Sequence, residues 1–360
     1  HNQYGRLQML FWYTLLGVGI FFIHSHLAQY TSRHSLQPFF SETNQQPFSI
    51  QASSYTSLPE SERYHYRETF ASNSNRQLVE NANWNINQHE LSLALRDQIP
   101  QQASVIAGSA TNDSVYVVWC DLRRDAGDIF AQRIDASGNR LWSQDLRVNS
   151  DIGTAIQFDP AIAVDSTGNL WVAWVDSRNN NNDIFVQRIN SNGETLWSDE
   201  RQINRNDNNA GQGADQGGAS ITLVPGQGAA VAWHDNRTGN YDVYVDRLND
   251  LGAFIWAENL RVNSDATDSS QTYPSLAASA SGNITIAWLD QRIGNSDIYV
   301  QRLTATGQRL WQSEVAVNQP AEAAQSHPSL ALNHSDESWV AWAAQQNGRL
   351  LAQQLDANGK

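Results

Sequence analysis

Cysteine and positive charge are both scarce in this chain of 360 residues. The single cysteine, Cys120, excludes a framework of internal disulfides, although it does not fix the cellular compartment. Lys and Arg total 23 against 37 Asp and Glu, which gives a formal net charge of -14. A surface of this sign repels the phosphates of nucleic acids. We therefore expect no nucleic-acid partner.

The short motifs of well-known catalytic and metal sites are also missing. The chain contains no CxxC, HExxH, P-loop or GxSxG sequence, and no nucleophile and base stand at a recognisable spacing. The sequence therefore predicts a protein that is not an enzyme and that holds no cofactor.

Long hydrophobic runs are absent except for one, from Leu7 to Ala28. At about 1.5 Å per residue, it is long enough for a short transmembrane helix within residues 1–28. The residues expected in the membrane are Leu10, Phe11, Trp12, Leu15, Leu16, Val18, Ile20, Phe21, Phe22 and Ile23. A cleaved signal peptide is the alternative, but no small-x-small cleavage site follows directly. We favour an uncleaved anchor in the inner (cytoplasmic) membrane, with the rest of the chain in the periplasm or outside the cell.

Two histidines, His24 and His26, stand at the end of this run. They are weak candidates for ligands of a haem or pigment, because histidine is a common axial ligand. We expect them to mark the membrane interface instead.

Residues 29–87 are rich in Ser, Asn and Gln and predict an extended linker without a core of its own. Scattered aromatic residues, such as Phe39, Tyr55 and Trp84, could anchor it on its own domain or on partner subunits. We favour membrane protein subunits as the partners of the helix and the linker.

A repeat occupies residues 88–360. Its centre is a W-x-D-x-R sequence whose tryptophans stand 55, 59, 55 and 54 residues apart. These are Trp119, Trp174, Trp233, Trp288 and Trp342, and the arginines are Arg123, Arg178, Arg237 and Arg292. Within one unit, short runs of alternating apolar residues end at Asp, Asn or Gly, which predicts four strands per unit. Such a period without helical patterning indicates the blades of a β-propeller.

The last repeat stops at Lys360, before its fourth strand would come. A segment resembling that strand precedes the first repeat, near Leu91 to Leu95. We therefore expect an all-β fold: a five-bladed β-propeller closed by an N-terminal strand, preceded by a single transmembrane helix and an extended linker. An unclosed fragment of a larger propeller is the alternative.

The W-x-D-x-R, D-I-Y-x-Q-R and G-x-x-L-W sequences resemble the repeats of bacterial surface β-propeller proteins. They are also loosely similar to the Asp-box turn of sialidase-like propellers, with Asp135, Gly138 and Trp142 in the first unit. Asn190, Asn249 and Thr304 replace Asp135 in later units and the spacing is longer, so the resemblance implies a fold and no sialidase chemistry.

Repeated acidic residues are the weak candidates for a Ca²⁺ site: Asp121, Asp128, Asp176, Asp183, Asp235, Asp242, Asp290 and Asp297. Because they recur in four consecutive units, we favour turn caps and Asp–Arg pairs between blades. Ala344 and Gln346 replace the Asp and Arg in the last unit. The recurring tryptophans likewise favour packing between blades over sugar binding.

Residues that break the repeat are better functional candidates: His234, His327, His334 and the insertion at 209–218. None forms a catalytic motif. We therefore expect a membrane-anchored, non-enzymatic accessory or scaffold subunit of a membrane complex. The alternatives are a surface glycan-binding or glycoside-cleaving propeller and a Ca²⁺-dependent adhesin.

Overall fold

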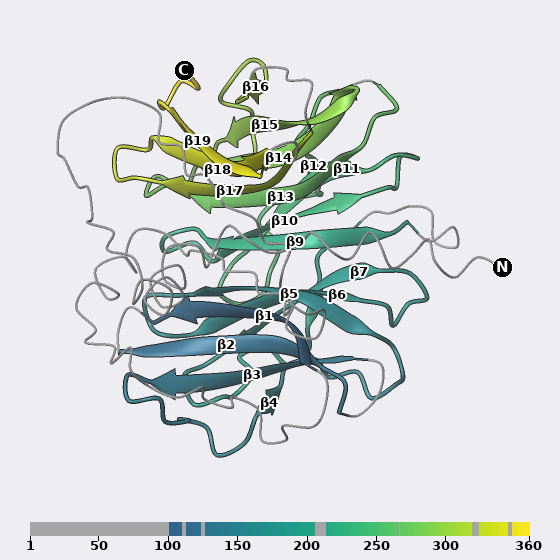
Figure 1. The fold of residues 1–360 in the computed structure, drawn as a ribbon. Coiled ribbons are helices and arrows are strands. Elements are labelled where there is room, and N and C mark those ends of the chain that lie inside the picture. The colour runs from purple at the N-terminus through teal and green to yellow at the C-terminus, as the bar shows by residue number, and fades with distance from the viewer. Residues whose placement is uncertain are drawn as a thin grey trace, which may run out of the picture.

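The computed structural model describes residues 101–109, 113–123, 127–205, 214–265, 267–318, 324–344 and 348–360. Every regular element in these ranges is a β-strand, which confirms the all-β prediction (Figure 1). None of these residues forms a helix that could cross a membrane. The predicted helix within 1–28, the linker at 29–87 and the strand near Leu91 to Leu95 lie outside the described residues.

Each of the first four repeats forms one four-stranded antiparallel sheet, as the sequence predicts for a blade. The first sheet holds β1 (Gln101–Gly108), β2 (Ser114–Asp121), β3 (Asp128–Asp135) and β4 (Leu146–Arg147). The second holds β5 (Gln157–Val164), β6 (Leu170–Asp176), β7 (Asp183–Ile189) and β8 (Arg201–Gln202). The third holds β9 (Gln216–Leu223), β10 (Ala229–Asp235), β11 (Asp242–Leu248) and β12 (Leu260–Arg261). The fourth holds β13 (Gln271–Ala278), β14 (Ile284–Ile293), β15 (Asn295–Leu303) and β16 (Val315–Ala316).

The fifth sheet has three strands in the described ranges: β17 (Gln325–Leu332), β18 (Ser338–Ala344) and β19 (Arg349–Leu355). In all five sheets the first strand in the sequence lies at one edge, and these inner strands pack against one another in chain order. Figure 1 shows the first sheet at the bottom of the view and the fourth and fifth sheets at the top, with the second and third between them.

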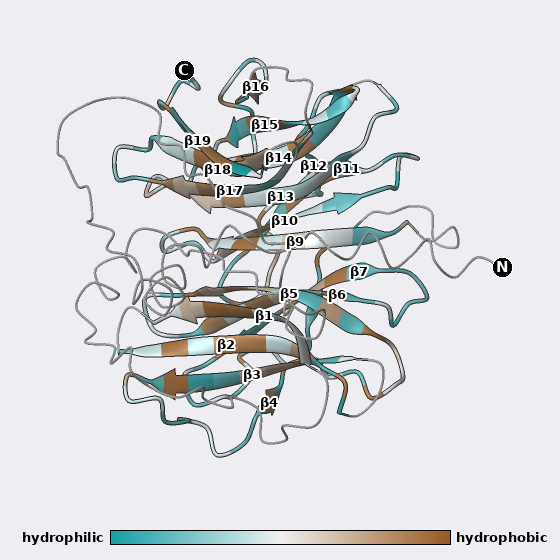
Figure 2. Ribbon diagram, in the orientation of Figure 1, coloured by the Kyte–Doolittle hydropathy of each residue, from teal (hydrophilic) through white to brown (hydrophobic). Residues whose placement is uncertain are grey.

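Alternating side chains on each central strand fill the two interfaces of its sheet. On β6, one face packs on the first sheet and the other on the third sheet. The residues facing the first sheet are Leu170, Val172 and Trp174, and those facing the third are Trp171, Ala173 and Val175. Figure 2 shows the apolar residues on the strands and polar residues in the connecting turns. A strand buried on both faces explains why "LWVAWV" contains no polar residue.

A tryptophan that precedes each outer strand joins one sheet to the next. Trp197 donates its Nε1–H to the Asp250 carbonyl of the third sheet at 3.0 Å. Its ring also lies against Gly252, where an added Cβ would come within 2.9 Å of the indole. Trp142, Trp256 and Trp311 make the same bond to Ser191, Ala305 and Ala357.

We expect Gly252→Ala to destabilise the protein more than Gly239→Ala, by about 1–2 kcal/mol. Both glycines have positive φ, at 73° and 108°, so alanine is strained at either position. Only at Gly252 must the added carbon also displace Trp197, because no atom lies within 4 Å of a Cβ at Gly239. Urea unfolding of both variants measures the difference. Equal losses would show that the tryptophan contact does not require glycine.

Candidate functional site

The first set of repeated aspartates lies at the ends of the second strands, where the carboxylates are buried. Asp176 accepts hydrogen bonds from the indole of Trp174 at 3.0 Å and from the backbone N–H of Arg178 at 3.0 Å. The Arg178 guanidinium pairs with the same carboxylate. Asp121, Asp235 and Asp290 repeat these contacts with Arg123, Arg237 and Arg292. These pairs join residues two positions apart in one sheet, so our expectation of Asp–Arg pairs between blades is wrong.

The fifth sheet lacks this arrangement. Ala344 stands at the position of the aspartate, and among the described residues the Nε1–H of Trp342 is buried without a hydrogen-bond partner.

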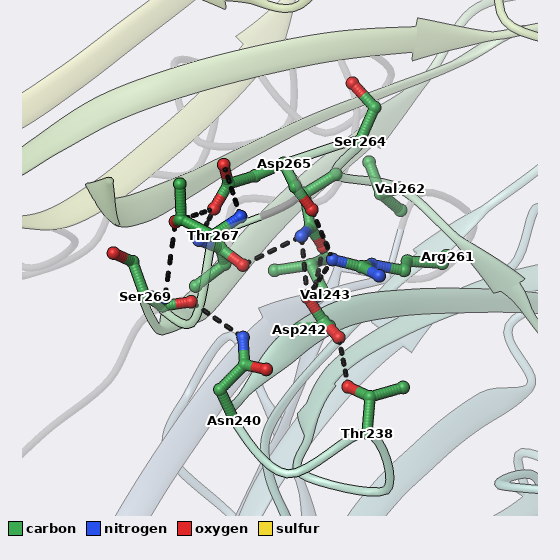
Figure 3. A network of polar contacts seen from close by, with 12 residues as sticks. Thr238, Asn240, Asp242, Val243, Arg261, Val262, Ser264, Asp265, Thr267 and Ser269 are labelled. Carbon is green, nitrogen blue, oxygen red and sulfur yellow. Dashed lines mark hydrogen bonds and ion pairs between the residues drawn. The ribbon is translucent and has the colours of Figure 1, made fainter. Parts of the chain in front are cut away.

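The second set of aspartates begins the third strands. Asp242 accepts bonds from Asn263 at 2.8 Å and from Thr238, and it pairs with Arg261 at 2.6 Å (Figure 3). Asn263 in turn accepts a bond from the Val243 backbone N–H at 2.9 Å. Asp128, Asp183 and Asp297 likewise accept from Asn149, Asn204 and Asn318.

The asparagines of this second set make the polar link between sheets. Asn263 donates to Gln271, the first residue of the next inner strand, at 2.8 Å. Asn149 and Asn204 make the same bond to Gln157 and Gln216. The carboxylates of both sets therefore accept bonds from N–H donors, and Asp242 also accepts one from a hydroxyl group, whereas Oδ2 of Asp128 is buried without a partner among the described residues. In the described ranges, no three His, Cys, Asp or Glu residues stand close enough together to hold a metal ion.

A different position, at the start of each inner strand, carries residues that do not repeat. Every inner strand has a bulge there, in which two residues lie opposite the one tryptophan of the W-x-D-x-R sequence. The first of the two residues is Asp159 in β5, Gly218 in β9, Tyr273 in β13 and His327 in β17. Neighbouring inner strands thus carry an acid, a glycine, a phenol and an imidazole at the same level.

The backbone at these bulges is strained. Asp159, Tyr273 and His327 have φ values of 50°, 54° and 53°, a region that residues other than glycine seldom adopt. Such strain persists only where the surrounding structure enforces it, and it gathers at functional sites. The three residues are each half-buried.

The His234 ring fills the space that side chains on Gly217 and Gly218 would take. A Cβ on Gly217 or Gly218 would come within 2.9 Å or 2.8 Å of the His234 ring, so only glycine leaves room for it. The ring stands edge-on to Tyr241 and Tyr273, with centroids 5.0 Å and 5.3 Å away. His234 Nδ1 accepts a hydrogen bond from the Tyr273 backbone N–H at 3.4 Å.

The two tyrosines stay neutral over a wider pH range than free tyrosine. Burial raises the pKa of Tyr273. Burial, followed by the charges of Asp215 and Asp235, raises the pKa of Tyr241. Their hydroxyl groups are therefore protonated donors at neutral pH.

The residues that break the repeat in the sequence include part of this site. His234, His327 and Gly218 were among the repeat-breaking residues, and the structure brings all three to the bulge region. His334 lies apart, in the exposed turn between β17 and β18. Asp159 and Tyr273 were missed, although both precede a proline, as His327 does. His24 and His26 lie outside the described residues.

No protein-family model matches the chain, and the search of curated proteins found no match. A protein of unknown function from Dyadobacter fermentans is similar in structure, with a TM-score of 0.50 and 9% identity over 75% of this chain and 82% of that one. The GH93 alpha-L-arabinofuranosidase of Fusarium graminearum, solved with arabinobiose, gives 0.47 and 13% over 70% and 76%. The endo-arabinase from Bacteroides thetaiotaomicron gives 0.44 and 12% over 73% and 94%.

These comparisons correct our main functional expectation. Solved structures similar to this chain include glycoside-cleaving enzymes, which runs against a non-enzymatic accessory or scaffold subunit and against the expectation of no enzyme. We withdraw both. At such low identities the likeness shows the fold alone, so the choice of activity must come from the site.

Proposed function

We propose that the protein binds a glycan chain at the bulged ends of its inner strands and cleaves a glycosidic bond there. The supporting observation is the row of unlike polar residues at one level of neighbouring inner strands: Asp159, Tyr273 and His327. Residues that serve only packing recur in every repeat, whereas a reacting group needs a single distinctive place.

Two residues of the row, Tyr273 and Asp159, act on the sugar in this proposal. The flat ring of Tyr273 stacks on a sugar, and its neutral hydroxyl donates a hydrogen bond. Gly217 and Gly218 leave room for the His234 ring, which lies beside Tyr273. Asp159 supplies the carboxyl group that protonates the leaving oxygen or supports the positive charge of the sugar in the transition state.

Glycoside hydrolysis commonly uses a second carboxylate. Asp215 is the candidate, because it directly precedes β9 and no other described repeat has an acid at that place. It is half-buried, and its carboxylate accepts a bond from the Asn182 backbone N–H at 3.3 Å.

We expect the purified full-length chain to bind and shorten a neutral polysaccharide, and Tyr273→Ala to lose at least about tenfold in affinity for it. A polysaccharide panel is scored for new reducing ends and, by calorimetry, for binding. Leu251→Ala, in an exposed turn at the other end of a sheet, is the control and should behave as the wild type. Binding that Tyr273→Ala leaves unchanged, or no binding to any glycan, would contradict the proposal.

The sequence adds further proposals for the parts beyond the described ranges. A helix within 1–28 anchors the chain in the cytoplasmic membrane, the linker at 29–87 spans the space beyond it, and the sheets act on glycans outside. This placement agrees with the resemblance to bacterial surface β-propeller repeats. We also propose that the five sheets form a ring closed by an N-terminal strand.

A further inference from the structure

The outer face of the fifth sheet is open where the other sheets are covered. Tyr116, Trp171, Ala230 and Thr285 hold the same place on the second strand of sheets one to four, facing the next sheet, and each is 0% exposed. Trp339 holds this place in the fifth sheet and is 47% exposed. Two other sheets also have an aromatic residue at this place, and in each of them a second aromatic ring covers it. The ring centroids of Trp171 and Trp197 are 5.2 Å apart, and those of Tyr116 and Trp142 are 5.8 Å apart.

The same sheet also lacks an outer strand within the described ranges. In the other four sheets this strand begins four residues after the joining tryptophan, as β8 at Arg201 follows Trp197. Both absences therefore concern one segment of sequence: a tryptophan followed closely by a short strand.

We infer that residues 84–91 are this segment and that Trp84 covers Trp339. In the second sheet, the residues four and five positions after Trp197 pair with the third strand, as Arg201 with Val186 and Gln202 with Phe185. The same count from Trp84 places Gln88 opposite Ala352 and His89 opposite Leu351. The occupant is thus the N-terminal part of the same chain.

Polar partners that the other sheets share are missing on both sides of this pairing. Seven residues after the tryptophan, sheets one to four have the asparagine that binds an aspartate, as Asn204 binds Asp183. The N-terminal segment has Leu91 at that place, and the fifth sheet has Arg349 where the aspartate would be.

The residue three after the tryptophan behaves in the same way. Asp145, Glu200 and Glu314 pair there with Arg123, Arg178 and Arg292, and in the third sheet Asn259 accepts a bond from Arg237. The N-terminal segment has Asn87, and the fifth repeat has Gln346 instead of the arginine. An acid without its arginine, or an asparagine without its aspartate, would leave a polar group unsatisfied at the interface, and neither occurs.

This pairing also fixes where the ring closes. Each joining tryptophan docks on a glycine in the next sheet, as Trp142 docks on Gly193. The corresponding glycine of the first sheet is Gly138, which has a positive φ of 83°. Trp84 therefore bridges the fifth sheet to the first, and the closing strand lies several residues earlier than the segment from Leu91 to Leu95.

A disulfide tests the register in the full-length chain. In the paired strands, residues 89 and 351 form a non-hydrogen-bonded pair, whose Cα atoms lie within disulfide reach. The variant with His89→Cys and Leu351→Cys should cross-link within one chain on mild oxidation, and Cys120 is buried and does not compete. Leu93→Cys with Leu351→Cys is the control and should stay reduced. A cross-link in the control only, or a cross-link between two chains, would overturn the pairing or its occupant.

Thermal unfolding tests the ring contact without new cysteines. Trp84→Ala and Trp339→Ala should each lower Tm by about 5–10 °C, and the double variant should lose little more than either single one. Trp12→Ala, in the predicted anchor, is the matched control and should leave this transition unchanged. Additive losses, or no loss for Trp84→Ala, would overturn the inference. The result does not depend on the proposed glycan cleavage.

Discussion

Replacing Asp176 by asparagine is expected to lower the free energy of unfolding by about 3–5 kcal/mol. The carboxylate is fully buried and accepts from the Trp174 indole, the Arg178 backbone and the Arg178 guanidinium, so both of its oxygens are used. Asparagine offers one acceptor oxygen and directs an NH₂ group at donors. The substitution also leaves the Arg178 guanidinium partly buried without this counter-charge.

Asp135→Asn is the matched control for this loss. Asp135 is the last residue of β3, and its Oδ1 accepts backbone bonds from Ser137 and Asn139 in the surface turn that follows, at 2.9 Å and 2.7 Å. Asn190 and Asn249 make the same bonds in the next two repeats, so asparagine should cost less than about 0.5 kcal/mol. Urea unfolding compares the two variants. An Asp176→Asn loss as small as the control's would mean that the buried pair adds little to stability.

Acid pH is expected to reduce the stability that the Asp176 carboxylate contributes. Burial alone would raise the pKa of Asp176, but the hydrogen bonds from Arg178 and Trp174 outweigh it, and the pKa in the folded state is lowered. Its contribution to stability is therefore complete above the unfolded pKa of about 3.9 and is lost as the pH falls below that value. The Asp176→Asn variant should show a correspondingly smaller loss of stability between neutral and acid pH.

The repeat itself explains how much of the fold the sequence predicts. Trp174 and its equivalents mark equal steps along the chain, and the alternation of apolar residues around them identifies the strands that the structure contains. The contacts of Arg178 were harder to foresee. Whether an Asp–Arg pair spaced by two residues closes within one strand end or reaches the next blade depends on the local turn, which composition does not reveal.

The sequence predicts only part of the candidate site, for a related reason. The bulge is a property of the strand pairing, and unlike residues such as Asp159, Gly218 and Tyr273 occupy it. Because the residue type differs from repeat to repeat, a comparison of the repeats finds no pattern at these positions. Three of the five bulges have a following proline, Pro160, Pro274 or Pro328, which cannot donate to a neighbouring strand and so favours an irregular strand start.

Asp159→Asn is expected to reduce glycoside hydrolysis by about a thousandfold while glycan affinity changes by no more than about threefold. The amide keeps the size of the carboxyl group but can neither donate its acidic proton nor carry its negative charge. Asparagine also tolerates a positive φ, so the bulge at 50° should persist where alanine would disturb it.

The measurement separates chemistry from binding and from folding. Hydrolysis rates are compared with calorimetric affinities for the same polysaccharide, with Asp135→Asn as an aspartate variant far from the bulges. Hydrolysis that survives in Asp159→Asn would remove this residue from the reaction. Parallel loss of binding and hydrolysis would instead make Asp159 a contact for the glycan. Losing an interaction that is equally strong in the bound state and the transition state lowers the affinity without changing the chemical step. The predicted pattern, with rate lost and affinity kept, requires that the carboxyl group act on the transition state alone.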